Sequence, residues 1–415
     1  MIIWWVIFNP GFFSGDSFAV IEMARSGKLN SDGTAIWAFF VSLISLNGKH
    51  PELVTLSLAL LTSISLSLLT KSLLPDKKGT ASSVILSLTP LIGVMAITLW
   101  HDIAMTCGFI FVAAAIIRKR ANLGHSTEIA ILGLFFSSFR YNGLPTILLF
   151  LLLLVFQTGL KRFIVQISII AIIFSIFSTA LNLDYASKTN VQTDGLTDWM
   201  TQDLSCYAAK SQDSEFFQEN FYGEASIYDW ASASACTWFR ESPAPSRLDP
   251  NVRANLVAAW FKLAKAHPEF ILKVHAKRNA YLVPLPIFGL PSMPFLHTTI
   301  EYPNEGIRFL NPGIAEMARV YPRIWNYFNF IFGYVGFWLL IIFYFGWKRK
   351  SQSYLLIGLL GLILTLELFI ASAISDARYG LFVLVTGQLI FIYEKIIPII
   401  SKLYRILTSK LKRLG

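Results

Sequence analysis

Charged residues are scarce in this chain. Asp, Glu, Lys and Arg make up 14% of its 415 residues, whereas hydrophobic residues make up 54%. With a mean hydropathy of +0.56, the chain has too few polar side chains to cover a soluble globule of this size. The composition excludes the common soluble classes and predicts an all-α protein that crosses a membrane many times.

Acidic residues are the rarer charged type: 25 Asp and Glu stand against 35 Lys and Arg, a net charge of +10. The basic residues gather in short connectors between apolar segments, so we assign them to membrane lipids and expect no nucleic-acid partner. The positive-inside rule places these connectors in the cytoplasm. They are Lys71 to Lys78, Arg118 to Arg120, Lys161 and Arg162, Lys348 to Lys350, and Lys395 to Arg413.

Apolar segments long enough for membrane helices recur along the chain. A hydrocarbon core about 30 Å thick needs about 20 apolar residues per helix, and somewhat fewer when flanking side chains reach the headgroups. We predict about ten such helices, over residues 1–13, 53–70, 82–99, 103–117, 126–139, 144–159, 163–182, 326–346, 354–373 and 380–398. The first is short and contains Asn9-Pro10, so we interpret it either as an interfacial or re-entrant helix or as the end of a span that begins upstream.

Three regions follow from this pattern: an N-terminal membrane module over 1–182, an outward-facing segment over 183–325, and C-terminal helices with a basic tail over 326–415. Within the first outer loop, Ser14 to Ser17 and the stretch around Ala35 to Leu46 predict two interfacial helices. Within the outward segment, Asp249-Pro250 predicts the start of an amphipathic helix over 251–282, which His267-Pro268 should kink or restart.

Cysteine is rare, with three residues in the chain. Cys206 and Cys236 both lie in the outward segment, and in an oxidising compartment they could form a disulfide. Two unpaired buried thiols are the alternative. Cys107 falls within a predicted span.

Four turns on the predicted outer side carry charge. They contain Asp16, Trp100-His101-Asp102, Arg140-Tyr141-Asn142-Gly143 and Asp376-Ala377-Arg378-Tyr379. Carboxylates and arginines at one depth suit a reaction in which a hydroxyl loses its proton and a phosphate leaves. Taken singly, each Asp could be a solvated helix cap and each Arg could reach to lipid phosphates, so their joint occurrence is what favours a site.

The order of these turns resembles that of the GT-C membrane glycosyltransferases that use lipid-phosphate sugars, a class including protein mannosyltransferases and lipid A aminoarabinose transferases. Pro10 to Ser17 is similar to the family's first acidic loop, and Trp100-His101-Asp102 resembles its second acidic turn. Arg140 to Gly143 resembles an Arg-x-Asn-Gly turn, and Asp376 to Tyr379 a late Asp-x-Arg-Tyr element. The chain departs from many relatives at Asn30 to Thr34, where they carry a Trp-His-Pro cluster.

The resemblance implies a hexosyltransferase of the bacterial inner membrane with its active site facing the periplasm. It would move a sugar, with inversion, from a polyprenyl-phosphate donor to an envelope glycan or lipid acceptor such as O-antigen or lipopolysaccharide. Asp16 and Asp102 would be the catalytic carboxylates, and Arg140 and Arg378 would bind the donor phosphate. The residues expected to contact or orient the acceptor are Asp32, His101, Asn142, Asp376 and Tyr379.

Cofactors and rival functions stay open from the sequence. Mg²⁺ or Mn²⁺ could take part, although one Asp and one His make a poor ligand set for either ion. An O-antigen polymerase or ligase acting on polyprenyl-diphosphate glycans would also have about ten spans and outer arginines. A lipid-linked sugar transporter would need ionisable residues within the membrane, and Glu367 is the main one; we expect Glu367 to be hydrogen-bonded within the bundle instead.

Overall fold

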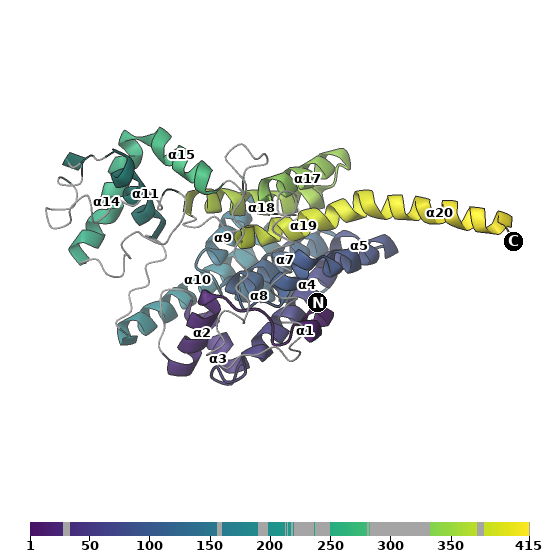
Figure 1. Cartoon of the computed structure of the whole chain (residues 1–415), viewed down its shortest axis with the longest axis horizontal. Helices are drawn as coiled ribbons and strands as arrows, with labels where there is room; N and C mark the ends of the chain where they lie inside the picture. Colours follow the sequence, from purple (N-terminus) through teal and green to yellow (C-terminus); the bar gives the residue numbers. More distant parts are fainter. Residues whose placement is uncertain are drawn as a thin grey trace.

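The computed structural model describes residues 1–27, 34–155, 160–189, 198–211, 213, 215–216, 219, 236, 250–279, 282, 333–371 and 377–414, and nearly all of these are helical. Most of the helices form one bundle (Figure 1). Helices α11, α14 and α15 lie to one side of this bundle, and the end of α20 extends away from it on the opposite side.

The described helices form two consecutive groups along the chain, one before and one after residues 190–197. The first group is α1 (Ile2–Ile7), α2 (Gly15–Ser26), α3 (Ala35–Ile44), α4 (Pro51–Leu73), α5 (Lys77–Leu88), α6 (Pro90–Ala96), α7 (His101–Arg120), α8 (Ser126–Ser137), α9 (Gly143–Leu154) and α10 (Lys161–Thr189). The second group is α11 (Asp198–Ser211), α14 (Pro250–Ala266), α15 (Pro268–Arg278), α17 (Val335–Lys348), α18 (Gln352–Ala371), η7 (Ala377–Gly380), α19 (Leu381–Phe391), η8 (Ile392–Ile396) and α20 (Ile397–Leu414).

Several of these helices are long and apolar enough to cross a membrane. In the described part of the chain there are five such segments: Pro51–Leu73, His101–Arg120, Lys161–Asp184, Gln352–Ile370 and Arg378–Ser409. Four more apolar helices are shorter, namely Ala35–Ile44, Ser126–Ser137, Gly143–Leu154 and Val335–Lys348. The apolar helices indicate a multi-pass membrane protein, whereas the predicted count of ten spans is not established.

The predicted bounds 1–13 of the first helix are wrong. Helix α1 ends at Ile7, and Phe12 instead forms a parallel β-bridge with Thr98. Pro10 has no backbone N–H to donate to a helix, and Gly11 takes a φ of +101°, which favours glycine. A Cβ on Gly11 would also lie 2.5 Å from the carbonyl oxygen of Ile97, so this close approach requires glycine.

The predicted helix over 82–99 is two helices rather than one. Helix α5 ends at Leu88 and α6 starts at Pro90. Thr89 between them is extended, with a ψ of 128°, because the ring of a proline disfavours the helical conformation of the residue before it.

The predicted helix starts near Ser14 and Ala35 are confirmed. Ser14 caps α2 through a reciprocal capping box with Ser17, and Thr34 caps α3 by accepting a hydrogen bond from the backbone N–H of Trp37 at 3.2 Å. In the outward segment, α14 ends before His267 and α15 begins at Pro268, as the sequence predicts.

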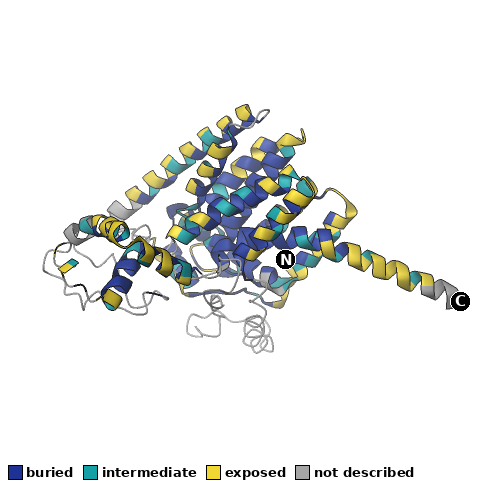
Figure 2. Cartoon of the chain, turned by 90° about the horizontal axis from the view of Figure 1, so that it is seen from above, coloured by how far each residue is buried: buried dark blue, intermediate teal, exposed yellow. Residues whose placement is uncertain are grey.

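Helix α7 is the centre of the bundle, since every residue from Asp102 to Ile117 is buried (Figure 2). It packs along α8 and α4. Its first turn carries Asp102 and its last turn carries Arg118, Lys119 and Arg120, which complements the helix dipole. Because 20 helical residues extend about 30 Å, these opposite charges lie at opposite ends of the bundle.

Gly108 sets the distance between α7 and α8. A Cβ there would lie 2.4 Å from Oγ of Ser137 and 2.7 Å from the carbonyl oxygen of Gly133, so the two backbones approach each other closely.

We expect Gly108→Ala to lower the free energy of unfolding by about 1–3 kcal/mol, because the added methyl group overpacks this contact. Gly124→Ala is the matched control, since a Cβ at Gly124 meets nothing within 4 Å. The two midpoints of thermal unfolding in detergent provide the measurement, and equal midpoints would contradict the prediction.

Candidate active site

Four charged side chains from separate parts of the sequence meet at one end of the bundle. Asp16 lies in the first turn of α2, Asp102 in the first turn of α7, Arg140 between α8 and α9, and Arg378 in η7. Arg378 Nη1 lies 2.8 Å from Asp16 Oδ2, and Arg140 Nη1 donates to Asp102 Oδ1. The cluster therefore brings together two carboxylates and two guanidinium groups.

Asp102 is the buried centre of this cluster, with a side chain that is 0% exposed. In addition to its bond from Arg140, its Oδ2 lies 3.6 Å from Nε of Arg378 and 3.8 Å from Nε2 of His101. A buried carboxylate is stable only when opposite charges or donors compensate for lost hydration. The two arginines supply that compensation, and Asp102 in turn holds them near each other.

Aromatic rings fix the planes of the two guanidinium groups. The Cζ atom of Arg140 lies 3.9 Å from the centroid of the Tyr379 ring. The Cζ atom of Arg378 lies 4.8 Å from the ring centroid of Trp100, and its Nη2 donates to the Tyr379 hydroxyl at 3.3 Å. A guanidinium stacked on aromatic faces keeps its edge N–H groups available for planar anions such as phosphate.

Two serines join the loop before α2 to the start of α7. Ser17 Oγ accepts from the Ser14 backbone N–H at 2.9 Å and donates to the carbonyl oxygen of Leu99 at 2.8 Å. The indole N–H of Trp100 donates to Ser14 Oγ at 2.7 Å. These bonds fix Asp16 beside the turn that carries Asp102.

Asn142 connects the site to α18. Its Nδ2 donates to Oε2 of Glu367 at 2.9 Å, and Thr146 Oγ1 donates to the same oxygen at 3.0 Å. The expectation that Glu367 is hydrogen-bonded within the bundle is confirmed. Its contact with Asn142 was not predicted, because Glu367 lies 225 residues away in the sequence.

The electrostatic environment of Asp16 keeps it ionised. Burial raises the pKa of this carboxyl group, but the attraction of Arg378 and its hydrogen bond, with a further contribution from Arg140, outweigh that effect. The resulting pKa lies below the ordinary aspartate value. At neutral pH, Asp16 is therefore a carboxylate that can accept a proton.

The predicted site residues divide into three groups. Asp16, Asp102, Arg140, Arg378, His101 and Tyr379 come together, and Asn142 lies at the edge of the cluster. Asp32 and Asp376 lie outside the described residues. Cys206 and Cys236 are bonded through their sulfur atoms in the outward segment. Sequence reasoning assigned no role to Ser14, Ser17 or the ring of Trp100, although they lie within the motifs that it singled out.

A metal site does not follow from this geometry. Among the described residues, no three His, Cys, Asp or Glu side chains lie close enough together to hold an ion. The carboxylates of Asp16 and Asp102 already face guanidinium groups, whose charge would repel a divalent cation.

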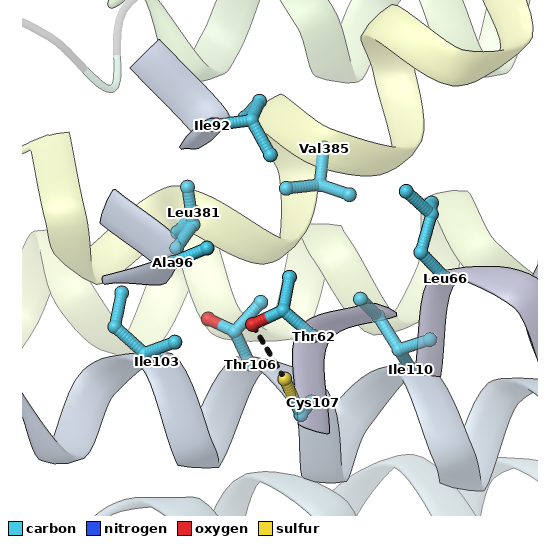
Figure 3. A pocket seen from close by; sticks show the side chains of 10 residues that line it. All are labelled: Thr62, Leu66, Ile92, Ala96, Ile103, Thr106, Cys107, Ile110, Leu381 and Val385. Carbon is cyan, nitrogen blue, oxygen red and sulfur yellow. Dashed lines mark hydrogen bonds between the residues drawn. The ribbon is translucent and has the colours of Figure 1, made fainter. Parts of the chain in front are cut away.

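A small apolar pocket lies among α4, α6, α7 and α19 (Figure 3). Ile103, one residue after Asp102, and Leu381, three residues after Arg378, both line it. The remaining lining residues come from α4, α6, α7 and α19: Thr62, Leu66, Ile92, Ala96, Thr106, Cys107, Ile110 and Val385. Thr62 Oγ1 and Cys107 Sγ lie 3.6 Å apart on its wall.

Comparisons with known proteins give little further information. No protein-family model matches the chain, and no curated protein matches it. Among solved structures, the chain is similar to the crystal structure of ArnT from Cupriavidus metallidurans in the apo state. The sequence identity is 12% and the TM-score is 0.36, over 94% of this chain and 74% of that chain. A likeness at this level does not establish a shared activity.

We expect Asp102→Ala to lower the free energy of unfolding by about 3–5 kcal/mol, because it leaves the buried guanidinium group of Arg378 and the partly buried one of Arg140 without their shared carboxylate. Asp16→Ala should cost less than about 1 kcal/mol, because the Asp16 side chain is 41% exposed and its ion pair is partly screened by solvent. Thermal unfolding of the two variants in detergent distinguishes these costs. Similar midpoints would show that Asp102 does not stabilise the cluster.

Proposed function

We propose that this protein is a membrane glycosyltransferase of the GT-C type. It transfers a sugar, with inversion, from a polyprenyl-phosphate donor to an acceptor hydroxyl on an envelope glycan or lipid. Lipopolysaccharide or its O-antigen is the acceptor that we propose. The observation that carries this proposal is the meeting of Asp16, Asp102, Arg140 and Arg378 at one end of the bundle.

The charges of this cluster match the requirements of the reaction. A phosphate that leaves as an anion needs fixed cations, and a guanidinium group can bind it through two parallel hydrogen bonds. An acceptor hydroxyl needs a base, and a carboxylate within hydrogen-bond reach can accept its proton.

In the proposed mechanism, the donor phosphate binds Arg378 and Arg140 and competes with Asp16 for Arg378. Asp16 is thereby released to take the proton of the acceptor hydroxyl. The acceptor oxygen bonds to the anomeric carbon from the face opposite the phosphate, and the bond from carbon to phosphate oxygen breaks. The polyprenyl phosphate leaves as an anion, and the proton on Asp16 passes to water.

The other candidate residues take supporting roles in this proposal. Because Asp102 has no exposed side-chain surface, we assign it to hold the two arginines in place rather than to contact the acceptor. Asp32, His101, Asn142, Asp376 and Tyr379 are proposed to orient the acceptor or the arginines.

Charge asymmetry supports an orientation with the site facing outward. Arg118 to Arg120 lie at the end of α7 opposite Asp102. Lys71 and Lys348 lie in the last turns of α4 and α17, and Lys161 is the first residue of α10. Under the positive-inside rule these helix ends face the cytoplasm. We therefore propose a bacterial inner-membrane protein with its site and its 183–325 segment in the periplasm.

Membranes supplied with radiolabelled polyprenyl-phosphate hexose provide the direct test. We expect label to move to a glycan or lipid acceptor with the wild type, and the rate to fall about 10²–10⁴-fold in Asp16→Asn, because that variant lacks a general base. Glu22→Gln is the matched control, since Glu22 is an exposed carboxylate on the same helix as Asp16. Chain extension from polyprenyl-diphosphate glycans, without transfer from any monophosphate donor, would favour a polymerase and refute the transferase.

The pH profile tests the assignment of the base. Arg378→Gln removes the cation whose attraction and hydrogen bond lower the pKa of Asp16, so the pKa rises. We expect the acid limb of kcat/KM to move to higher pH in this variant, in addition to an overall loss of rate. Arg349→Gln, at the basic end of α17, should leave the limb in place. An acid limb unchanged in Arg378→Gln would mean that Asp16 is not the titrating base.

A further inference from the structure

A second buried charged cluster lies outside the candidate active site, among the helices of the outward segment. Asp203 on α11 accepts a hydrogen bond from the indole N–H of Trp260 on α14 at 2.8 Å. On α15, Nε2 of His275 lies 2.7 Å from Oδ2 of Asp203, and Nη2 of Arg278 lies 2.9 Å from Oδ1. One carboxylate thus joins three helices.

The cluster is almost completely removed from solvent. The side chains of Asp203 and Arg278 are 0% exposed, and that of His275 is 4% exposed. Breaking a buried ion pair by removing one partner costs far more than breaking an exposed one. The three helices are therefore held together by polar contacts that fix one arrangement.

The same cluster reaches the end of α18. Nδ1 of His275 lies 2.8 Å from the carbonyl oxygen of Phe369, and Nδ2 of Asn279 donates to that oxygen at 3.3 Å. The last four carbonyl groups of a helix lack partners within the helix, and Phe369 is among them because α18 ends at Ala371. Helix α15 therefore supplies the donors that α18 lacks.

The ring of His275 lies between Asp203 and the end of α18. Its Nε2 faces a carboxylate oxygen of Asp203 at 2.7 Å, and its Nδ1 faces the carbonyl oxygen of Phe369 at 2.8 Å. One side chain of α15 therefore contacts both α11 and α18.

The last turns of α18 are also held from the bundle. Glu367, two residues before Phe369, binds Asn142 and Thr146. Arg378 follows Phe369 by nine residues along the chain and pairs with Asp16. The end of α18 thus has the outward helices on one side and the candidate active site on the other.

We propose that Asp203, His275 and Arg278 form a clamp that docks the outward helices on the end of α18 and thereby positions Arg378 for the donor phosphate. His275 is a positioning residue in this scheme, since it acts through Phe369 and does not touch the substrate. This proposal rests on the proposed function for its effect on catalysis, but not for the clamp itself.

Hydrogen–deuterium exchange tests the clamp without any activity. We expect the backbone amides of residues 365–371 to exchange about tenfold faster in His275→Gln than in wild type, because the contact of the imidazole ring with the helix end is lost. His267→Gln is the matched control, because His267 precedes α15 and bonds the Tyr207 hydroxyl on α11 at 3.0 Å. If His275→Gln raises exchange throughout α4 and α7, that variant disturbs the whole bundle and the milder Asn279→Ala provides the test. In Asn279→Ala we expect faster exchange that is confined to residues 365–371. Wild-type exchange of that segment in both variants would overturn the clamp.

Steady-state kinetics test the positioning role. His275→Gln should raise KM for the polyprenyl-phosphate donor by about tenfold with a smaller change in kcat, because Arg378 binds the phosphate while Asp16 remains intact. His267→Gln should leave both constants unchanged. Altered exchange with unaltered KM would overturn the positioning of Arg378. If wild type shows no transfer at all, the proposed function fails, and the exchange result still decides the clamp.

Discussion

The carboxylate of Asp102, buried between two guanidinium groups, is the constraint on which the site depends. It begins the central helix α7, where the helix dipole favours a negative charge, and it pairs with Arg140 while Arg378 lies 3.6 Å away. An uncompensated charge at this depth would be costly, so the turn after α8 and the η7 turn must both approach the start of α7. That requirement brings Arg378 within reach of Asp16.

The end of α18 is held by contacts on two sides. Glu367 binds Asn142 from the bundle, and the carbonyl oxygen of Phe369 binds His275 from the outward segment. Both contacts satisfy groups that would otherwise be buried without partners, so both favour one position of the helix end. Helix α15, which is far from Asn142 in sequence, is thereby in contact with the same helix end as Asn142.

Sequence patterns made of a few adjacent residues predicted helix starts correctly. The restart of the outward helix at His267-Pro268 and the start of α2 after Ser14 follow from the residues at each helix end. The predicted helix bounds 1–13 and 82–99 are wrong because a hydropathy profile counts apolar residues and takes no account of the backbone conformation at proline. Pro10 follows the short helix α1, and Pro90 separates α5 from α6, so each segment is divided instead of forming one continuous helix.

The sequence by itself determined that this is a helical membrane protein with basic residues at one end of its helices, and it identified the four charged residues of the site. Composition and charge position suffice for this, because the membrane acts on each segment separately. Only the tertiary structure decided that Arg378 pairs with Asp16, that Arg140 pairs with Asp102, and that Glu367 and His275 hold the end of α18. These pairings join residues far apart in the sequence, and they depend on how the helices pack, which no local pattern encodes.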